Sequence, residues 1–94
     1  MTYAIAFDLD TATLKATYPN PSWNNAYGDI RKVIEPLGFS WQQGSVYFGD
    51  ETVNAVTCVL AAQGLSNTYP WFKACVRDMR MLRIEEMNDL RPAL

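Results

Sequence analysis

The chain has 94 residues, of which 49% are hydrophobic and 13% aromatic, which is enough for one hydrophobic core and too little for two domains. We therefore expect a single domain spanning residues 1–94. The 8 basic and 10 acidic side chains give a formal net charge of -2, which excludes a surface that attracts nucleic acid everywhere, so any polyanion site must be local.

The two cysteines and the first residues of the chain indicate the cellular compartment. Cys58 and Cys75 show no CxxC spacing, so neither a zinc site nor a disulfide framework is indicated, and we expect both to be reduced core residues. The start of the chain lacks the regions of a signal peptide, and no apolar run approaches the roughly 18 residues that a membrane span needs. These features predict a cytoplasmic protein without a membrane partner.

The first predicted element is a strand over residues 3–9. Bulky and small or polar side chains alternate there, with Tyr3, Ile5, Phe7 and Leu9 on one face and Asp8 with two alanines on the other. The next segment, 10–22, holds Pro19, Pro21 and several Thr and Asn residues, which predicts a loop.

A helix is predicted over residues 22–37. Ser22 is a good N-cap, and apolar residues recur from Trp23 to Leu37 with the i, i+3, i+4, i+7 spacing of an amphipathic helix. Pro36 and Gly38 mark its end.

Strand character follows over residues 39–49, as two strands or as one strand bent at Gln43–Gly44. Asp50 is then expected to cap a second helix, 51–63, that ends at Gly64. Its predicted core face consists of Val53, Val56, Val59 and Leu60.

The last part of the chain is expected to contain a short helical turn opened by Pro70 and a final strand over residues 76–85. A helix also fits the periodicity of 76–85, but the alternation favours a central strand buried on both sides, followed by an irregular tail. The order of elements predicts an α+β, ferredoxin-like fold of the split βαβ type, with helices on one face of an antiparallel sheet.

The absence of histidine restricts the chemistry open to this chain. Acid and base catalysis falls to Asp, Glu, Tyr, Lys or Arg, and the only metals indicated are hard cations held by oxygen ligands, such as Mg²⁺. Asp8 and Asp10 end the first strand, where the sheet would hold a carboxylate in a fixed position; the alternative is a solvated turn. Asp78 lies between Arg77 and Arg80, where a structural salt bridge is the alternative.

A serine, a group of basic residues and several aromatic residues are further candidates for substrate contacts. Ser45 follows Gly44 without a GxSxG motif or a histidine partner, so it is expected to hold a phosphate or a metal-bound water rather than to attack as a nucleophile. Five of the 8 basic residues lie in the last 22 positions, either as a solvated face or as a phosphate-contacting patch. Several aromatic residues can stack on bases, but core packing is favoured for them; they are Trp23, Tyr27, Trp41, Tyr47, Trp71 and Phe72.

Several segments, in order along the chain, resemble the virulence-associated protein D (VapD) family. The likeness runs from Tyr3 to about Asp89 and is carried by YAIAFDL at 3–9, NAY at 25–27, DIR at 29–31, GF at 38–39 with Trp41, QGSVY at 43–47, WFK at 71–73 and VRDMR at 76–80.

The resemblance implies a dimeric endoribonuclease, similar in fold to the small CRISPR-associated adaptation nuclease, that acts as the toxin of a toxin-antitoxin pair. Carried over by position, it implies Asp8, Ser45 and Asp78 as catalytic residues. It further implies Leu14, placed among the RNA-binding residues, as a supporting apolar neighbour in the loop after the first strand. Arg77 and Arg80, which flank Asp78, are expected to contact the RNA. Asp10 departs from the family pattern and leaves open which acid acts.

The resulting hypothesis is an endoribonuclease that cleaves single-stranded RNA. Asp8 and Asp78 would meet across a cleft of a homodimer, with Asp8 as general base or Mg²⁺ ligand, Ser45 on the phosphate, and Arg77 or Arg80 offsetting the developing charge. Sequence leaves the metal-bound and metal-free routes open. The alternatives are a non-catalytic dimeric adaptor and a small-ligand-binding regulator, the latter disfavoured because the five glycines form no ligand loop.

Overall fold

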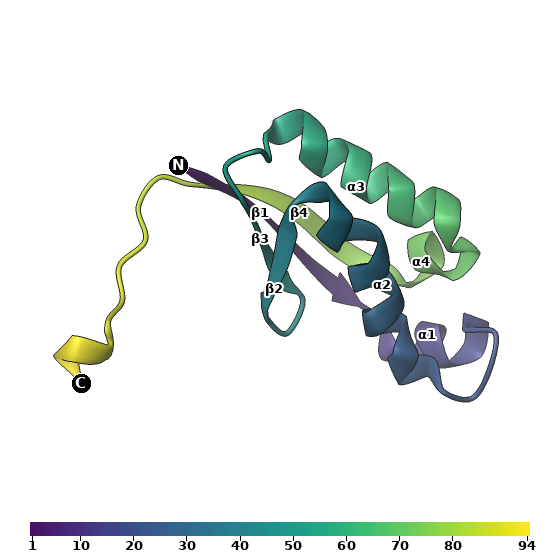
Figure 1. Ribbon diagram of the computed structural model, residues 1–94. Coiled ribbons are helices and arrows are strands. Elements are labelled where there is room, and N and C mark those ends of the chain that lie inside the picture. The colour runs from purple at the N-terminus through teal and green to yellow at the C-terminus, as the bar shows by residue number, and fades with distance from the viewer.

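The computed structural model describes residues 1–94 and contains one four-stranded antiparallel sheet, with α2 and α3 on one of its faces (Figure 1). The strands are β1 (Thr2–Leu9), β2 (Phe39–Gln43), β3 (Val46–Gly49) and β4 (Val76–Ile84), in the spatial order β2-β3-β1-β4. The two long helices each connect strands that have another strand between them. This arrangement confirms the predicted α+β, ferredoxin-like fold.

The alternation predicted for the first strand is present in β1. Ile5, Phe7 and Leu9 face the helices and are 2%, 6% and 6% exposed, whereas Asp8 lies on the uncovered face and is exposed. Because β1 pairs with β3 on one side and β4 on the other, it is a central strand of the sheet.

The predicted loop at 10–22 is wrong in its first half, which forms the helix α1 (Thr11–Thr17). The Asp10 carboxylate caps this helix by accepting hydrogen bonds from the Ala12 amide (3.1 Å) and the Thr13 hydroxyl (3.0 Å). Leu14 is completely buried and attaches the helix to the core. The cap and this one apolar contact outweigh the low helix propensity of the threonines, and the prolines come only after the helix has ended.

The helix predicted at 22–37 is present with a distorted beginning and end. The α-helical part, α2 (Ala26–Ile34), lies between the 3-10 turns η1 (Trp23–Asn25) and η2 (Glu35–Leu37). Pro36 is accommodated near the start of η2, where its missing N–H is not needed. Gly38 then ends the segment with φ of 106°, a left-handed conformation that favours glycine.

Residues 39–49 form two strands rather than one bent strand. β2 and β3 pair as a hairpin whose turn consists of Gly44, with φ of 51°, and Ser45.

The second long helix, α3 (Ala55–Thr68), differs from its prediction at both ends. Asn54, not Asp50, is the N-cap: its side chain accepts from the Thr57 amide (3.0 Å), and the Thr57 hydroxyl accepts from the Asn54 amide (3.2 Å). The helix also continues through Gly64, where an added Cβ would lie 3.6 Å from Val33, so the glycine marks close packing against α2 rather than a helix end.

The predicted core face of α3 is wrong except at Val53, which is buried but precedes the helix. Val56, Val59 and Leu60 are 65%, 53% and 54% exposed, while Cys58, Ala61 and Leu65 are buried. The helix has apolar residues around its whole circumference, so periodicity alone does not select one face. In the folded protein, the face of α3 that packs against the core is the one with Cys58, Ala61 and Leu65, which includes smaller side chains than the predicted face.

The chain ends with α4 (Pro70–Cys75), β4 and a tail that includes the 3-10 turn η3 (Arg91–Ala93) and extends away from the sheet (Figure 1). The predicted last strand is confirmed, but β4 is an edge strand rather than a central one, and most of its residues are exposed. Cys58 and Cys75 are buried free thiols. None of the helices has the length and apolarity needed to cross a membrane.

Candidate active site at the end of the sheet

Asp8 and Asp78 are cross-strand partners in the β1–β4 ladder. Their side chains are 66% and 52% exposed. Directly opposed residues in an antiparallel pair project to the same face of the sheet, so both carboxylates lie on the face that the helices leave uncovered. The register shifts immediately after Asp8, so the acids stand where regular pairing of the two strands breaks off.

Two arginines accompany these acids. Arg80 Nε donates to both carboxylate oxygens of Asp78, at 3.0 and 3.2 Å, and Arg77 Nε lies 3.9 Å from an oxygen of Asp8. Exposed ion pairs of this kind stabilise a fold by about 0–1 kcal/mol. The arrangement thus puts two cations beside two anions at one solvent-exposed point, at little benefit to stability.

Asp10 has a different role from Asp8. Its carboxylate is occupied by the α1 cap, and the hydrogen bond from the Thr13 hydroxyl is the main cause that lowers the pKa of Asp10 below its ordinary value. Asp8 takes part in no cap. The sequence carried a signal for this difference, because Asp is a preferred N-cap residue and the hydroxyl of Thr13, three residues later, can donate to it.

Ser45 lies at the same end of the sheet but on the other face. The Phe7 amide donates to the Ser45 carbonyl at 3.1 Å, which places Ser45 beside the residue that precedes Asp8. Since Val46 pairs with Ala6 on the uncovered face, alternation turns Ser45 toward the helices, and its side chain lines a pocket together with residues of η1 and α2. The structure therefore brings Asp8 and Asp78 together and separates Ser45 from them by the thickness of the sheet.

Leu14, predicted among the RNA-binding residues, has no exposed surface on which RNA could bind. It lies in α1 rather than in a loop. It supports the site only indirectly, because it fixes the helix that follows β1.

The basic residues near the C-terminus are mostly paired with acids. The ion pairs are Arg77–Asp8 (3.9 Å), Arg80–Asp78 (3.0 Å), Arg83–Glu85 (2.8 Å) and Arg91–Asp89 (2.5 Å). The cations without a carboxylate partner are Lys73 and, around α1 and α2, Lys15, Arg31 and Lys32. Three of these four unpaired cations thus lie on or near α1 and α2, in a stretch that also carries Asp10, Asp29 and Glu35.

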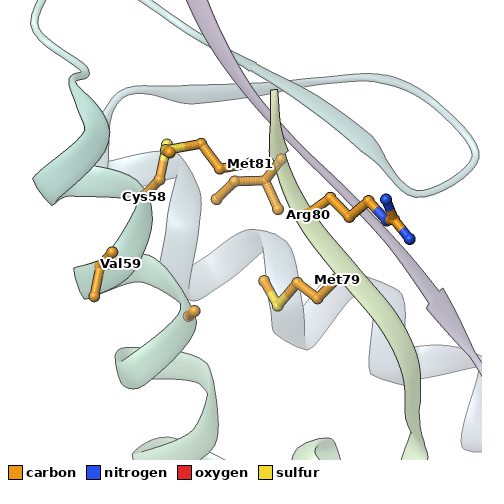
Figure 2. Close-up of a pocket in the computed structure, with 7 residues that line it drawn as sticks. Cys58, Val59, Met79, Arg80 and Met81 are labelled. Carbon is orange, nitrogen blue, oxygen red and sulfur yellow. The ribbon is translucent and has the colours of Figure 1, made fainter. Parts of the chain in front are cut away.

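A small apolar pocket of about 150 Å³ lies between α3 and β4 (Figure 2). Cys58 and Val59 approach it from α3 and Met79 and Met81 from β4, while the guanidinium of Arg80 points away from them. The pocket contains no acid. The Arg80 side chain instead belongs with Asp78.

No three acidic or cysteine side chains gather in a group that suits a metal ion. Within one chain, Asp8 and Asp78 offer two carboxylates as oxygen ligands.

No protein-family model matches the chain. Curated relatives cover almost all of it: an endoribonuclease VapD homolog of Helicobacter pylori is 59% identical over 92 residues, which are 98% of this chain and 95% of the relative. Endoribonuclease VapD 2 of Riemerella anatipestifer is 53% identical over 98% of both chains. Endoribonuclease VapD of Dichelobacter nodosus is 45% identical over 93% of this chain and 90% of its own. Identity of this extent, on a fold that pairs the first-strand and last-strand acids, shows that the chain belongs to the VapD endoribonuclease family.

Proposed function

We propose that this protein is an endoribonuclease that cleaves single-stranded RNA, with Asp8 and Asp78 as its catalytic carboxylates. The observation that carries the proposal is the direct cross-strand pairing of these acids, exposed and flanked by Arg77 and Arg80. The names of the relatives, all endoribonucleases, support the same activity.

In the metal-free route, Asp8 accepts the proton of a ribose 2′-hydroxyl. The 2′-oxygen then attacks the adjacent phosphorus, the bond to the 5′-oxygen breaks, and that oxygen takes a proton from water, which leaves a 2′,3′-cyclic phosphate. Arg77 and Arg80 offset the negative charge that builds on the phosphoryl oxygens, and Asp78 holds Arg80 in position through its two hydrogen bonds. This route needs the 2′-hydroxyl and so excludes DNA as a substrate.

The same two carboxylates suit Mg²⁺, which binds through one or two acids and keeps several of its waters. Bound there, it would supply an activated water and neutralise phosphate charge. Ser45, on the opposite face, is assigned to holding the RNA rather than to the bond-breaking step.

The test is cleavage of a defined single-stranded RNA by wild type, Asp8→Asn and Asp78→Asn, each in Mg²⁺ and in EDTA. Both substitutions keep the side-chain shape, and each is expected to slow cleavage by about 10²–10⁴-fold. Asp89→Asn is the matched control, because Asp89 also pairs with an arginine but lies in the tail. Equal cleavage by all four proteins would indicate a contaminating nuclease and favour the adaptor hypothesis.

The products identify the route. A 2′,3′-cyclic phosphate formed in EDTA supports the metal-free mechanism. A requirement for Mg²⁺ together with a 5′-phosphate end supports the metal-bound one.

The uncovered face of the sheet supports a homodimer as part of the proposal. Such faces are usually polar, yet here the face carries small and large apolar residues, namely Ala4, Ala6, Val46, Phe48, Leu82 and Ile84. Ala4 is 0% exposed because Phe48 and Leu82 stand on either side of it in register, while Leu82 itself is 41% exposed. A second copy on this face would bring two Asp8–Asp78 pairs into one cleft.

The proposal extends to the role of toxin in the cytoplasm, neutralised by an antitoxin protein that covers the acids or separates the dimer. Induced expression tests it: wild type is expected to arrest bacterial growth, and Asp8→Asn is expected not to. Growth arrest by both proteins would contradict a toxic role for RNA cleavage.

A further inference from the structure

A pocket with four polar or glycine residues among its six lining residues lies on the helix side of the β2–β3 hairpin. It has a volume of about 410 Å³ and is lined by Asn24, Tyr27 and Arg31 of η1 and α2 and by Trp41, Gly44 and Ser45 of the hairpin. We call it the Trp41 pocket. Because the Phe7 amide donates to the Ser45 carbonyl at 3.1 Å, the pocket borders the strand end that carries Asp8.

The Trp41 ring is held in place although it is not buried. Its indole N–H donates to the Gly44 carbonyl at 2.8 Å, and the Arg31 guanidinium lies 4.6 Å from the ring centroid. The side chain is nevertheless 47% exposed, whereas the stacked aromatics Phe7 and Tyr47 are at most 6% exposed. A fixed, half-exposed aromatic ring offers a surface on which a base can stack. Because the Trp41 side chain is already ordered, binding costs little further conformational entropy.

Arg31 brings a positive charge to the pocket, where its guanidinium packs over the Trp41 ring. It forms no ion pair, and its Nε is buried without a hydrogen-bond partner. The neighbouring acid, Asp29, accepts a hydrogen bond from the Tyr18 hydroxyl at 2.5 Å, which raises the pKa of Tyr18 to about 12. Arg31 therefore brings to the pocket a cation that forms no ion pair, whereas Arg77 and Arg80 of β4 each lie beside an acid.

We propose that the Trp41 pocket binds a nucleobase of the RNA strand adjacent to the cleaved bond. The base stacks on the Trp41 indole, Ser45 and Asn24 offer hydrogen-bonding groups to its edge, and Arg31 attracts the neighbouring phosphate. The RNA strand then passes around the hairpin turn, from the acids on one face to the pocket on the other. This inference rests on the proposed function and adds to it the place where a base is recognised.

The experiment measures binding rather than cleavage. Short 2′-O-methyl oligonucleotides in EDTA carry 2-aminopurine or an abasic nucleotide at each position in turn, and affinity is followed by fluorescence anisotropy. At the position bound by the pocket, 2-aminopurine fluorescence is quenched by stacking, and loss of the base weakens binding to wild type by about 5- to 150-fold.

Two substitutions at Trp41 separate stacking from simple apolar contact. Trp41→Leu is expected to bind the intact oligonucleotide about 5- to 150-fold more weakly than wild type and to leave 2-aminopurine unquenched. Its affinity should also no longer depend on whether the base is present. Trp41→Phe should retain most of the affinity and most of the quenching. Leu60→Ala is the matched control, because Leu60 is 54% exposed and lies on α3, outside the pocket. Thermal denaturation checks that every variant is folded.

The outcomes distinguish this inference from the proposed function. If wild type cleaves RNA in an Asp8-dependent way but Trp41→Leu binds as tightly as wild type, with the base still quenched, the pocket assignment is wrong and the proposed function stands. If wild type neither cleaves nor binds RNA, the proposed function fails and this inference fails with it.

Discussion

Asp8 and Asp78 place two carboxylates directly opposite each other on neighbouring strands, a pairing of like charges that opposes folding. Because each acid is only weakly compensated by an exposed arginine, we predict that Asp8→Asn leaves the protein as stable as wild type or stabilises it by a few tenths of a kcal/mol, while it removes activity. Thermal denaturation at low and high salt measures this, and any gain should shrink as salt screens the repulsion. A clear drop in the melting temperature would instead assign Asp8 a structural role.

Gly49 and Val53 are in close contact, since a Cβ at Gly49 would lie 2.5 Å from the Val53 Cβ. Gly49→Ala is therefore expected to destabilise the fold by about 1–3 kcal/mol in urea denaturation, through overpacking where β3 leads toward α3. Gly28→Ala is the control: nothing lies within 4 Å of an added Cβ there, so the substitution in α2 should stabilise the protein by about 0.5–1 kcal/mol. Equal effects of the two substitutions would contradict the contact.

The pH dependence of stability should reveal the α1 cap. The folded-state pKa of Asp10 is lowered, so its ionised form contributes stability that is present above the unfolded-state pKa and is lost as pH falls through the folded-state pKa. Asp10→Asn keeps a capping oxygen but no charge. We predict that wild type melts above Asp10→Asn at neutral pH and that the difference disappears in acid; a constant difference would mean that the charge of Asp10 is irrelevant.

The dimer proposal predicts different consequences for two exposed leucines. Leu82→Glu places a charge on the uncovered sheet face and should convert a dimer to a monomer, as measured by light scattering, with reduced RNA cleavage. Leu60→Glu, an equivalent change on α3, should leave the oligomeric state unchanged. A wild-type monomer, or an unaltered Leu82→Glu dimer, would contradict the proposed interface.

Sequence patterns located the elements with a single clear period. The alternation of 3–9 and the helical spacing of 22–37 each have one apolar face, and each matches β1 or the η1–α2–η2 segment. The core face of α3 could not be predicted in this way, because apolar residues lie around the whole helix. The helix α1 was missed because only its N-cap and one buried leucine stabilise it.

The candidate site was predictable in its residues but not in its geometry. Sequence and family resemblance singled out Asp8, Ser45 and Asp78. Their arrangement depends on the strand order and register, because only these place Asp78 opposite Asp8 and turn Ser45 to the other face. The exposure of Trp41 likewise depends on the hairpin and was not apparent from its aromatic character.

The position of β4 at the edge of the sheet has a consequence for solubility. Its outer backbone N–H and C=O groups are unpaired over a nine-residue strand that also presents Met81 and Leu82, a pattern that templates aggregation when nothing interrupts it. Arg77, Arg80 and Arg83 recur at every third residue along this edge and keep other strands from adding to it. Charged residues on an exposed edge strand act as gatekeepers against fibril formation, and two of these arginines, Arg77 and Arg80, also neighbour the candidate catalytic acids.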